Sequence, residues 1–66
     1  MDIRQLRYFL AVAEERSFSR AAKRLHVAQP ALSLHVRKME EVFGTFLLVR
    51  GASGVTPTEA GEMLMR

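Results

Sequence analysis

The sequence predicts a small, mainly helical domain that ends in a two-stranded hairpin and the beginning of a further helix. Two observations predict this fold class. Apolar residues recur at helical spacing through three successive segments as far as residue 43. After Gly44 the pattern changes to a short β-prone run, a glycine-containing loop and a second β-prone run.

The first two expected helices each follow a residue that can cap a helix. The first begins after Asp2 and runs to about Glu15 or Arg16, and the second follows Ser17 and covers residues 18–25. The expected inward side chains of the first helix are Ile3, Leu6, Phe9, Leu10 and Ala13. Those of the second helix are Phe18, Ala21, Ala22 and Leu25.

The third expected helix covers residues 29–43 and is separated from the second by a three-residue turn, 26–28. Pro30 lies in its first turn, where the missing backbone N–H costs little. Gly44 ends the helix, because glycine tolerates a left-handed cap. The expected inward stripe of this helix is Leu32, Val36, Met39 and Phe43.

The hairpin is expected to use residues 46–49 and 55–56 as its strands, with Pro57 ending the second strand. Two residues compete as the cap of the following helix. Thr56 would place Pro57 at the first helical position, whereas Thr58 would start the helix later. The sequence covers only about two turns of this helix, so we expect the helix to continue in a longer protein.

Three helices, a short turn and a hairpin together describe a winged helix-turn-helix. We expect residues 1–57 to form this domain and residues 58–66 to begin a linker helix. The third helix, about residues 29–43, would enter the major groove of DNA, which admits one helix. The wing, about residues 46–56, would lie along the DNA backbone.

The basic residues are concentrated in the middle of the sequence. The net charge is +3, and no acidic residue occurs between Arg16 and Lys38. The basic residues of this segment are Arg16, Arg20, Lys23, Arg24, Arg37 and Lys38. A block of one sign is typical of a surface that faces phosphates. The alternative is a solvated helical face that happens to be basic.

The candidate DNA contacts fall into two groups. On the third helix, the face opposite the apolar stripe carries the candidates for base contact, Gln29, Pro30, Ser33 and Leu34. Glutamine can pair with adenine through two hydrogen bonds, and serine can contact several bases. The alternative for Gln29 and Ser33 is ordinary polarity at a helix start. The candidates for phosphate contact are Ser19, Arg20, Lys23, Arg24, Arg37 and Arg50.

The sequence gives little support for an enzyme, a metal-binding protein or a membrane protein. The sequence contains no cysteine, so it forms neither a disulfide nor a thiolate zinc site. No acidic residue lies between His26 and His35, which argues against a metal site and against a Ser-His-acid arrangement. We therefore expect no enzyme activity and no cofactor. The longest apolar run, residues 46–49, is too short to span a membrane, and the charged N-terminus is unlike a signal peptide, so a cytoplasmic protein is expected.

Four short motifs resemble the signature of LysR-type transcription regulators in order and spacing. They are Leu-Arg-Tyr-Phe at 6–9, Ser-Phe-Ser-Arg-Ala-Ala at 17–22, Leu-His-Val-Ala-Gln-Pro-Ala-Leu-Ser at 25–33, and Thr-Glu-Ala-Gly at 58–61. The resemblance implies that Gln29, Pro30 and Ser33 lie at the major groove. It also implies that the helix from Thr58 pairs two subunits. A C-terminal domain, absent from this sequence, would bind a small-molecule effector.

Three positions depart from the family pattern. Leu34 stands where the family is often basic, and a leucine can contact a thymine methyl but donates no hydrogen bond. The wing lacks the extra arginine of many members, which leaves Arg50 alone, and Pro57 replaces a common apolar strand residue. Two alternatives remain open at this point: a ModE-like regulator, whose DNA-binding domain is similar, and a winged helix used for contact with another protein.

Overall fold

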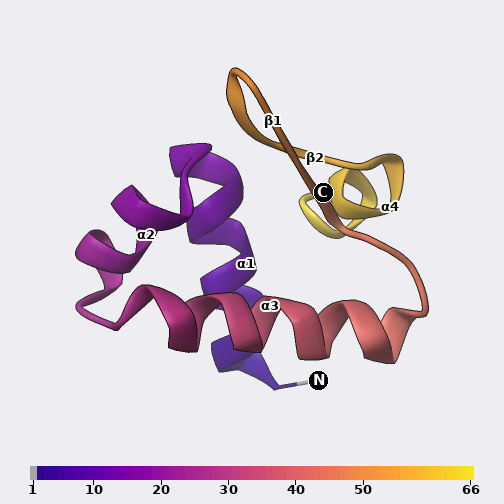
Figure 1. The fold of residues 1–66 in the computed structure, drawn as a ribbon. Coiled ribbons are helices and arrows are strands. Elements are labelled where there is room, and N and C mark those ends of the chain that lie inside the picture. Colours follow the sequence, from indigo (N-terminus) through magenta and orange to yellow (C-terminus); the bar gives the residue numbers. More distant parts are fainter. Residues whose placement is uncertain (1) are drawn as a thin grey trace.

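The computed structural model describes residues 2–66 and has the mainly helical, winged architecture that the sequence predicts. Its elements are, in chain order, α1 (Ile3–Glu15), α2 (Phe18–Leu25), α3 (Gln29–Phe43), β1 (Leu48–Gly51), β2 (Gly54–Pro57) and α4 (Glu59–Leu64). Helix α3 crosses α1, and α2 lies beside the start of α3. In the view of Figure 1, α2 lies to the left of α1 and the hairpin to its right.

Local capping interactions set the bounds of the first three helices. The Asp2 carboxylate accepts a hydrogen bond from the backbone N–H of Gln5 (2.8 Å), and the Ser17 hydroxyl accepts one from the backbone N–H of Arg20 (3.1 Å). These contacts satisfy N–H groups that a helix start leaves unpaired. The helices end at residues in the left-handed conformation, which are Arg16, His26 and Gly44.

One apolar core joins the three helices to the hairpin. The largest fully buried side chains are Phe9, Val12, Leu32, Met39 and Leu47. The hairpin contributes Leu48 and Val55 to the same cluster. The wing is therefore part of the packed domain, and its position relative to α3 is fixed by burial of apolar side chains.

Two residues at helix ends are exposed, although the sequence predicted that they face the core. Ile3 is 77% exposed and Phe43 is 42% exposed. Both residues occupy an end of their helix, and the last turn of α3 extends past the helices that cover its middle (Figure 1). In α1, Ala11 and Val12 are buried instead, and Leu6 and Leu10 are half-buried.

The first strand begins later than the sequence predicted. Phe46 is 72% exposed and lies outside the strand, and Leu47 is buried just before it. The backbone N–H of Leu47 donates to the Glu40 carboxylate (2.8 Å) and not to a neighbouring strand. Pairing starts at Leu48, which lies opposite Pro57 in the antiparallel register.

Thr58 is the residue that caps α4, which resolves the choice between the two candidate caps. Its hydroxyl accepts from the backbone N–H of Gly61 (3.1 Å) and donates to the carbonyl of Phe46 (2.7 Å). A side chain at position 61 would collide with the carbonyl oxygen of Leu47, so only glycine allows α4 to approach this closely. The start of α4 is thereby docked against the segment that leads into the wing.

Candidate nucleic-acid interface

Helix α3 presents one buried and one accessible face. Leu32, Val36 and Met39 are buried in the core. The four residues predicted to face bases lie on the other side: Gln29, Pro30 and Leu34 are exposed, and Ser33 is half-buried. Residues at positions i, i+1, i+4 and i+5 share one face of a helix, so a groove-facing surface is geometrically available.

The other side of this surface is formed by the start of α2 and the wing. A groove between these elements and the start of α3 is lined by Ser19, Arg20, Gln29 and Arg50, among others. An adjacent hollow is lined by Ser33, Arg37 and Arg50 over apolar side chains. The fold thus brings together candidate base and phosphate contacts from three separate segments of the sequence.

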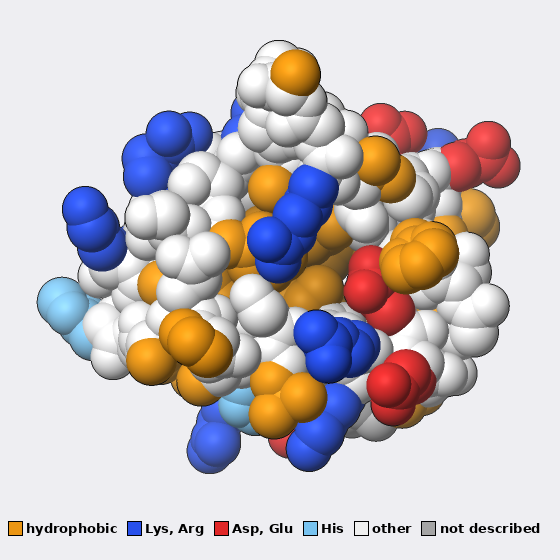
Figure 2. Space-filling model, in the orientation of Figure 1, with side chains coloured by type: hydrophobic (Ala, Val, Ile, Leu, Met, Phe, Trp, Pro, Cys, Tyr) orange, Lys and Arg blue, Asp and Glu red, His pale blue; other side chains and the backbone are white. Residues whose placement is uncertain are grey.

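Charge is distributed unevenly over this face. Basic side chains gather over α2 and along α3, and acidic side chains gather toward the end of α3 and α4 (Figure 2). Such a gradient favours approach of a polyanion at the end of the face that carries the start of α3.

The wing arginine contacts both of the other elements. The guanidinium carbon of Arg50 lies 4.1 Å above the centroid of the Phe18 ring, within the range of a cation–π interaction. The Nη2 atom of Arg50 donates a long hydrogen bond to the Ser33 hydroxyl (3.4 Å). Arg50 therefore connects β1 to both helices of the helix-turn-helix.

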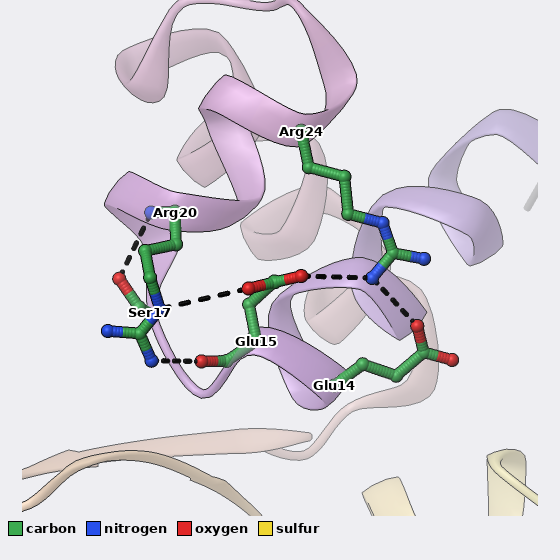
Figure 3. A network of polar contacts seen from close by, with 5 residues as sticks. All are labelled: Glu14, Glu15, Ser17, Arg20 and Arg24. Carbon is green, nitrogen blue, oxygen red and sulfur yellow. Dashed lines mark hydrogen bonds and ion pairs between the residues drawn. The ribbon is translucent and has the colours of Figure 1, made fainter.

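Two predicted phosphate contacts are engaged by carboxylates of α1. Arg24 Nη1 lies 2.8 Å from a carboxylate oxygen of Glu14 and 3.3 Å from one of Glu15. Arg20 Nε lies 3.7 Å from the Glu15 carboxylate, and Arg20 also donates to the Glu15 backbone carbonyl (Figure 3). The hydrogen bond that the Arg24 guanidinium donates to Glu14, and next the one that it donates to Glu15, raise the pKa of Arg24.

This carboxylate network is a feature that the sequence reasoning missed. The central segment contains no acidic residue, but the tight turn between α1 and α2 places Glu14 and Glu15 beside it. The available signal was that Glu14 and Glu15 lie three and two residues before the Ser17 cap, and therefore near the start of α2. Arg24 also lines a hollow together with residues of α1, such as Leu6 and Leu10, and not the groove of Gln29.

A second missed residue, Glu40, ties α3 to the wing. Its carboxylate accepts hydrogen bonds from the backbone N–H groups of Leu47 (2.8 Å) and Leu48 (3.2 Å). Bonds from N–H groups to a carboxylate are stronger than those between neutral groups. Glu40 therefore holds the entry of β1 against the helix that carries Gln29 and Ser33.

Two further features are absent from residues 2–66. No group of three or more potential ligands could hold a metal ion in this part of the chain. Over the same residues, no helix has the length and apolar character needed to cross a membrane.

Replacing both glutamates of the network is expected to strengthen DNA binding. The double variant Glu14→Gln, Glu15→Gln would release Arg20 and Arg24 to contact phosphates, which raises affinity several-fold at low salt and makes the log–log salt slope steeper by about 1 to 2. Fluorescence anisotropy on a scrambled duplex at several salt concentrations measures both changes.

The matched control for this prediction is Glu41→Gln, Glu62→Gln, which changes the net charge equally. Both control residues are exposed, and within residues 2–66 neither forms an ion pair. The control should alter affinity through net charge alone and leave the slope nearly unchanged. An equal rise in slope for both variants would contradict a specific role of the network.

A three-helix core, an accessible face on the third helix and a hairpin that completes a basic groove define a winged helix-turn-helix DNA-binding domain. The model of the family "Bacterial regulatory helix-turn-helix protein, lysR family" matches residues 3–62. The chain belongs to the LysR family, and it is the DNA-binding domain of that family.

Curated relatives support this assignment along nearly the whole chain. The chain is 52% identical over 64 residues to the HTH-type transcriptional regulator XapR of Escherichia coli (strain K12), which covers 97% of this chain and 22% of XapR. It is 47% identical over 66 residues to the Hca operon transcriptional activator HcaR of the same organism, covering 100% of this chain and 22% of HcaR. The chain therefore spans about a fifth of the length of these relatives.

Solved structures agree with the same assignment. The complex of the BenM DNA-binding domain with catB site 1 DNA matches with a TM-score of 0.93 at 47% identity, over 97% of this chain and 71% of that chain. The complex of the CbnR DNA-binding domain with DNA matches with a TM-score of 0.92 at 43% identity, over 98% and 75%. The resemblance to LysR-type regulators is confirmed, and the ModE-like alternative is not favoured.

Proposed function

We propose that this domain binds double-stranded DNA in a sequence-specific manner and thereby directs a transcription regulator to its operator. Helix α3 enters the major groove, and the wing formed by β1 and β2 follows the sugar-phosphate backbone. The observation that carries this proposal is the convergence of Gln29, Ser33 and Arg50 on one basic, accessible surface. The DNA complexes of the BenM and CbnR domains support it, because their folds match this one closely.

The candidate contacts take two roles in this proposal. The base-facing residues on α3 are Gln29, Pro30, Ser33 and Leu34, and those that contact phosphates are Ser19, Arg20, Lys23, Arg24, Arg37 and Arg50. Phosphate contacts fix the position of the domain on DNA, whereas contacts to base edges select the sequence. Arg20 and Arg24 contact phosphate only by exchanging their carboxylate partners for it.

Further properties of the proposal concern the longer regulator. The helix that begins with α4 pairs two subunits, and two exposed methionines, Met63 (62%) and Met65 (40%), supply apolar surface for this contact. Residues 58–66 then belong to the linker and residues 1–57 to the DNA-binding domain. A small-molecule effector acts through a separate domain. The protein works in the cytoplasm, where bacterial DNA lies, and has no enzyme activity.

Two alanine substitutions separate sequence selection from backbone contact. Gln29→Ala should weaken binding to the preferred site by about 1–3 kcal/mol and remove the preference at one or two base pairs, because it deletes a base-edge contact. Lys23→Ala should weaken binding to specific and scrambled DNA alike, because phosphates carry no sequence information. The preferred site comes from selection of bound duplexes from a random pool.

Both variants alter exposed residues, so their melting curves should match that of the original domain. If a folded Gln29→Ala protein loses equal affinity on both duplexes, α3 is not the helix that selects the sequence. If the original domain binds no duplex at all, a winged helix that contacts another protein becomes the better account.

A further inference from the structure

The contacts of Arg50 set it apart from the other arginines near the groove. Within residues 2–66, the ion pairs involve Arg20 and Arg24 with the glutamates of α1, whereas Arg50 lies over an aromatic ring. An aromatic ring attracts a cation without neutralising it. Arg50 thus keeps its full charge while its position is constrained.

The surroundings of Arg50 explain why its guanidinium stays close to α3. The hollow between the wing and α3 has a floor of apolar side chains that includes Phe18, Val36 and Leu48. Basic side chains lie across this apolar floor on the face that Figure 2 displays. A guanidinium is planar and weakly hydrated, so it can stack on the Phe18 ring and still donate hydrogen bonds from its edge.

The edge of this guanidinium reaches a residue that the proposed function assigns to base contact. Arg50 Nη2 donates to Ser33 Oγ across 3.4 Å. A serine hydroxyl offers two acceptor lone pairs and one donated hydrogen. With one lone pair engaged by Arg50, the hydroxyl oxygen is held in place and its hydrogen can be donated outward.

We propose that Arg50 is a positioning residue for Ser33, so that the wing and α3 select bases as one unit. Stacked on Phe18, Arg50 orients the Ser33 hydroxyl to donate toward an acceptor on a base edge. The acceptors available in the major groove are O6 and N7 of guanine, N7 of adenine and O4 of thymine. This inference rests on the proposed function, and it assigns Arg50 a part in sequence selection beyond the phosphate contact already assigned to it.

The decisive variant is Arg50→Lys, which keeps the charge and removes the planar fork. A lysine ammonium is a point charge that cannot stack flat on Phe18 and donate sideways to Ser33 at once. Arg50→Lys should therefore retain binding to scrambled DNA within about 3-fold, with an unchanged salt slope. On the selected duplex it should lose about 10-fold or more in affinity.

Two further variants complete the test. Ser33→Ala should lose the preference for the selected duplex over the scrambled one, as Arg50→Lys does. The affinity of the double variant for the selected duplex should be no more than about 2- to 3-fold below that of either single variant, because both changes act through one contact. Arg7→Lys is the matched control, because Arg7 is an exposed arginine of α1 that lines a hollow away from the groove and forms no cation–π contact within residues 2–66. It should retain the preference.

The results overturn the inference if Arg50→Lys keeps the preference, if Ser33→Ala has no effect on it, or if the two losses multiply in the double variant. These outcomes leave the proposed sequence-specific binding of DNA through α3 intact, provided that the original domain prefers the selected duplex over the scrambled one. The second outcome also removes Ser33 from the base contacts. Absence of that preference in the original domain overturns the proposed function itself. Circular dichroism of each variant establishes that it is folded.

Discussion

Raising the salt concentration fourfold is expected to weaken DNA binding by this domain by roughly 40- to 500-fold. Each phosphate that a cationic side chain neutralises releases condensed counterions, so the logarithm of the affinity falls by about 0.9 per contact per logarithmic unit of salt. Five cationic residues are candidates: Arg20, Lys23, Arg24, Arg37 and Arg50. The size of the effect depends on how many of them contact phosphate.

The carboxylate network limits how many of these five residues contact phosphate. Arg20 and Arg24 are held by Glu14 and Glu15, so about three to five contacts form, which gives a log–log slope between roughly −2.7 and −4.5. Titration of a scrambled duplex by fluorescence anisotropy from 50 to about 200 mM salt measures the slope. A flat response would remove nucleic acid as the partner of this surface.

The helix bounds were predictable because they depend on short-range contacts. A carboxylate or hydroxyl that caps a helix bonds to a backbone N–H three residues away, so Asp2 and Ser17 mark helix starts in the sequence itself. Gly44 marks an end for an equally local reason, its left-handed conformation. The choice between Thr56 and Thr58 required the structure, because Thr58 also bonds to the distant carbonyl of Phe46.

The position of Gln29 and Ser33 on the accessible face of α3 was also predictable, since helical periodicity alone places them opposite the buried stripe. What the sequence could not predict are contacts between elements. The pairing of Glu14 with Arg24 depends on the angle between α1 and α2, and the bonds from Leu47 and Leu48 to Glu40 depend on the path of the chain into the wing. Spacing along the chain contains no information about these angles.

The same distinction explains the wrong expectation at Phe43. Periodicity places this residue on the buried stripe, but burial also requires another element to lie over it. The last turn of α3 extends beyond the helices that cover Leu32 and Val36, so Phe43 remains 42% exposed. A sequence pattern predicts which face of a helix is apolar, whereas the packing of neighbours determines how much of that face is covered.

Leu32→Ala is expected to remove about 2–5 kcal/mol from the free energy of unfolding, because Leu32 is fully buried and its truncation leaves a cavity. At 66 residues the domain has a total stability on the order of 3–10 kcal/mol, so the variant loses a large part of its stability. The melting temperature should fall by roughly 10 to 40 °C, as followed by circular dichroism. DNA affinity should fall as the folded fraction falls.

Leu34→Ala makes the same chemical change on the same helix, at a position that is 46% exposed. Its free energy of unfolding should change by no more than about 0.5 kcal/mol, as for ordinary surface substitutions, and its melting temperature should change little. Its preference at one base pair should change instead, since Leu34 faces the groove in the proposed complex, where an apolar side chain contacts a thymine methyl. The two leucines, two positions apart, therefore separate the stability of the domain from its sequence preference. If Leu34→Ala destabilises the domain as much as Leu32→Ala does, the division of α3 into a core face and a groove face is wrong.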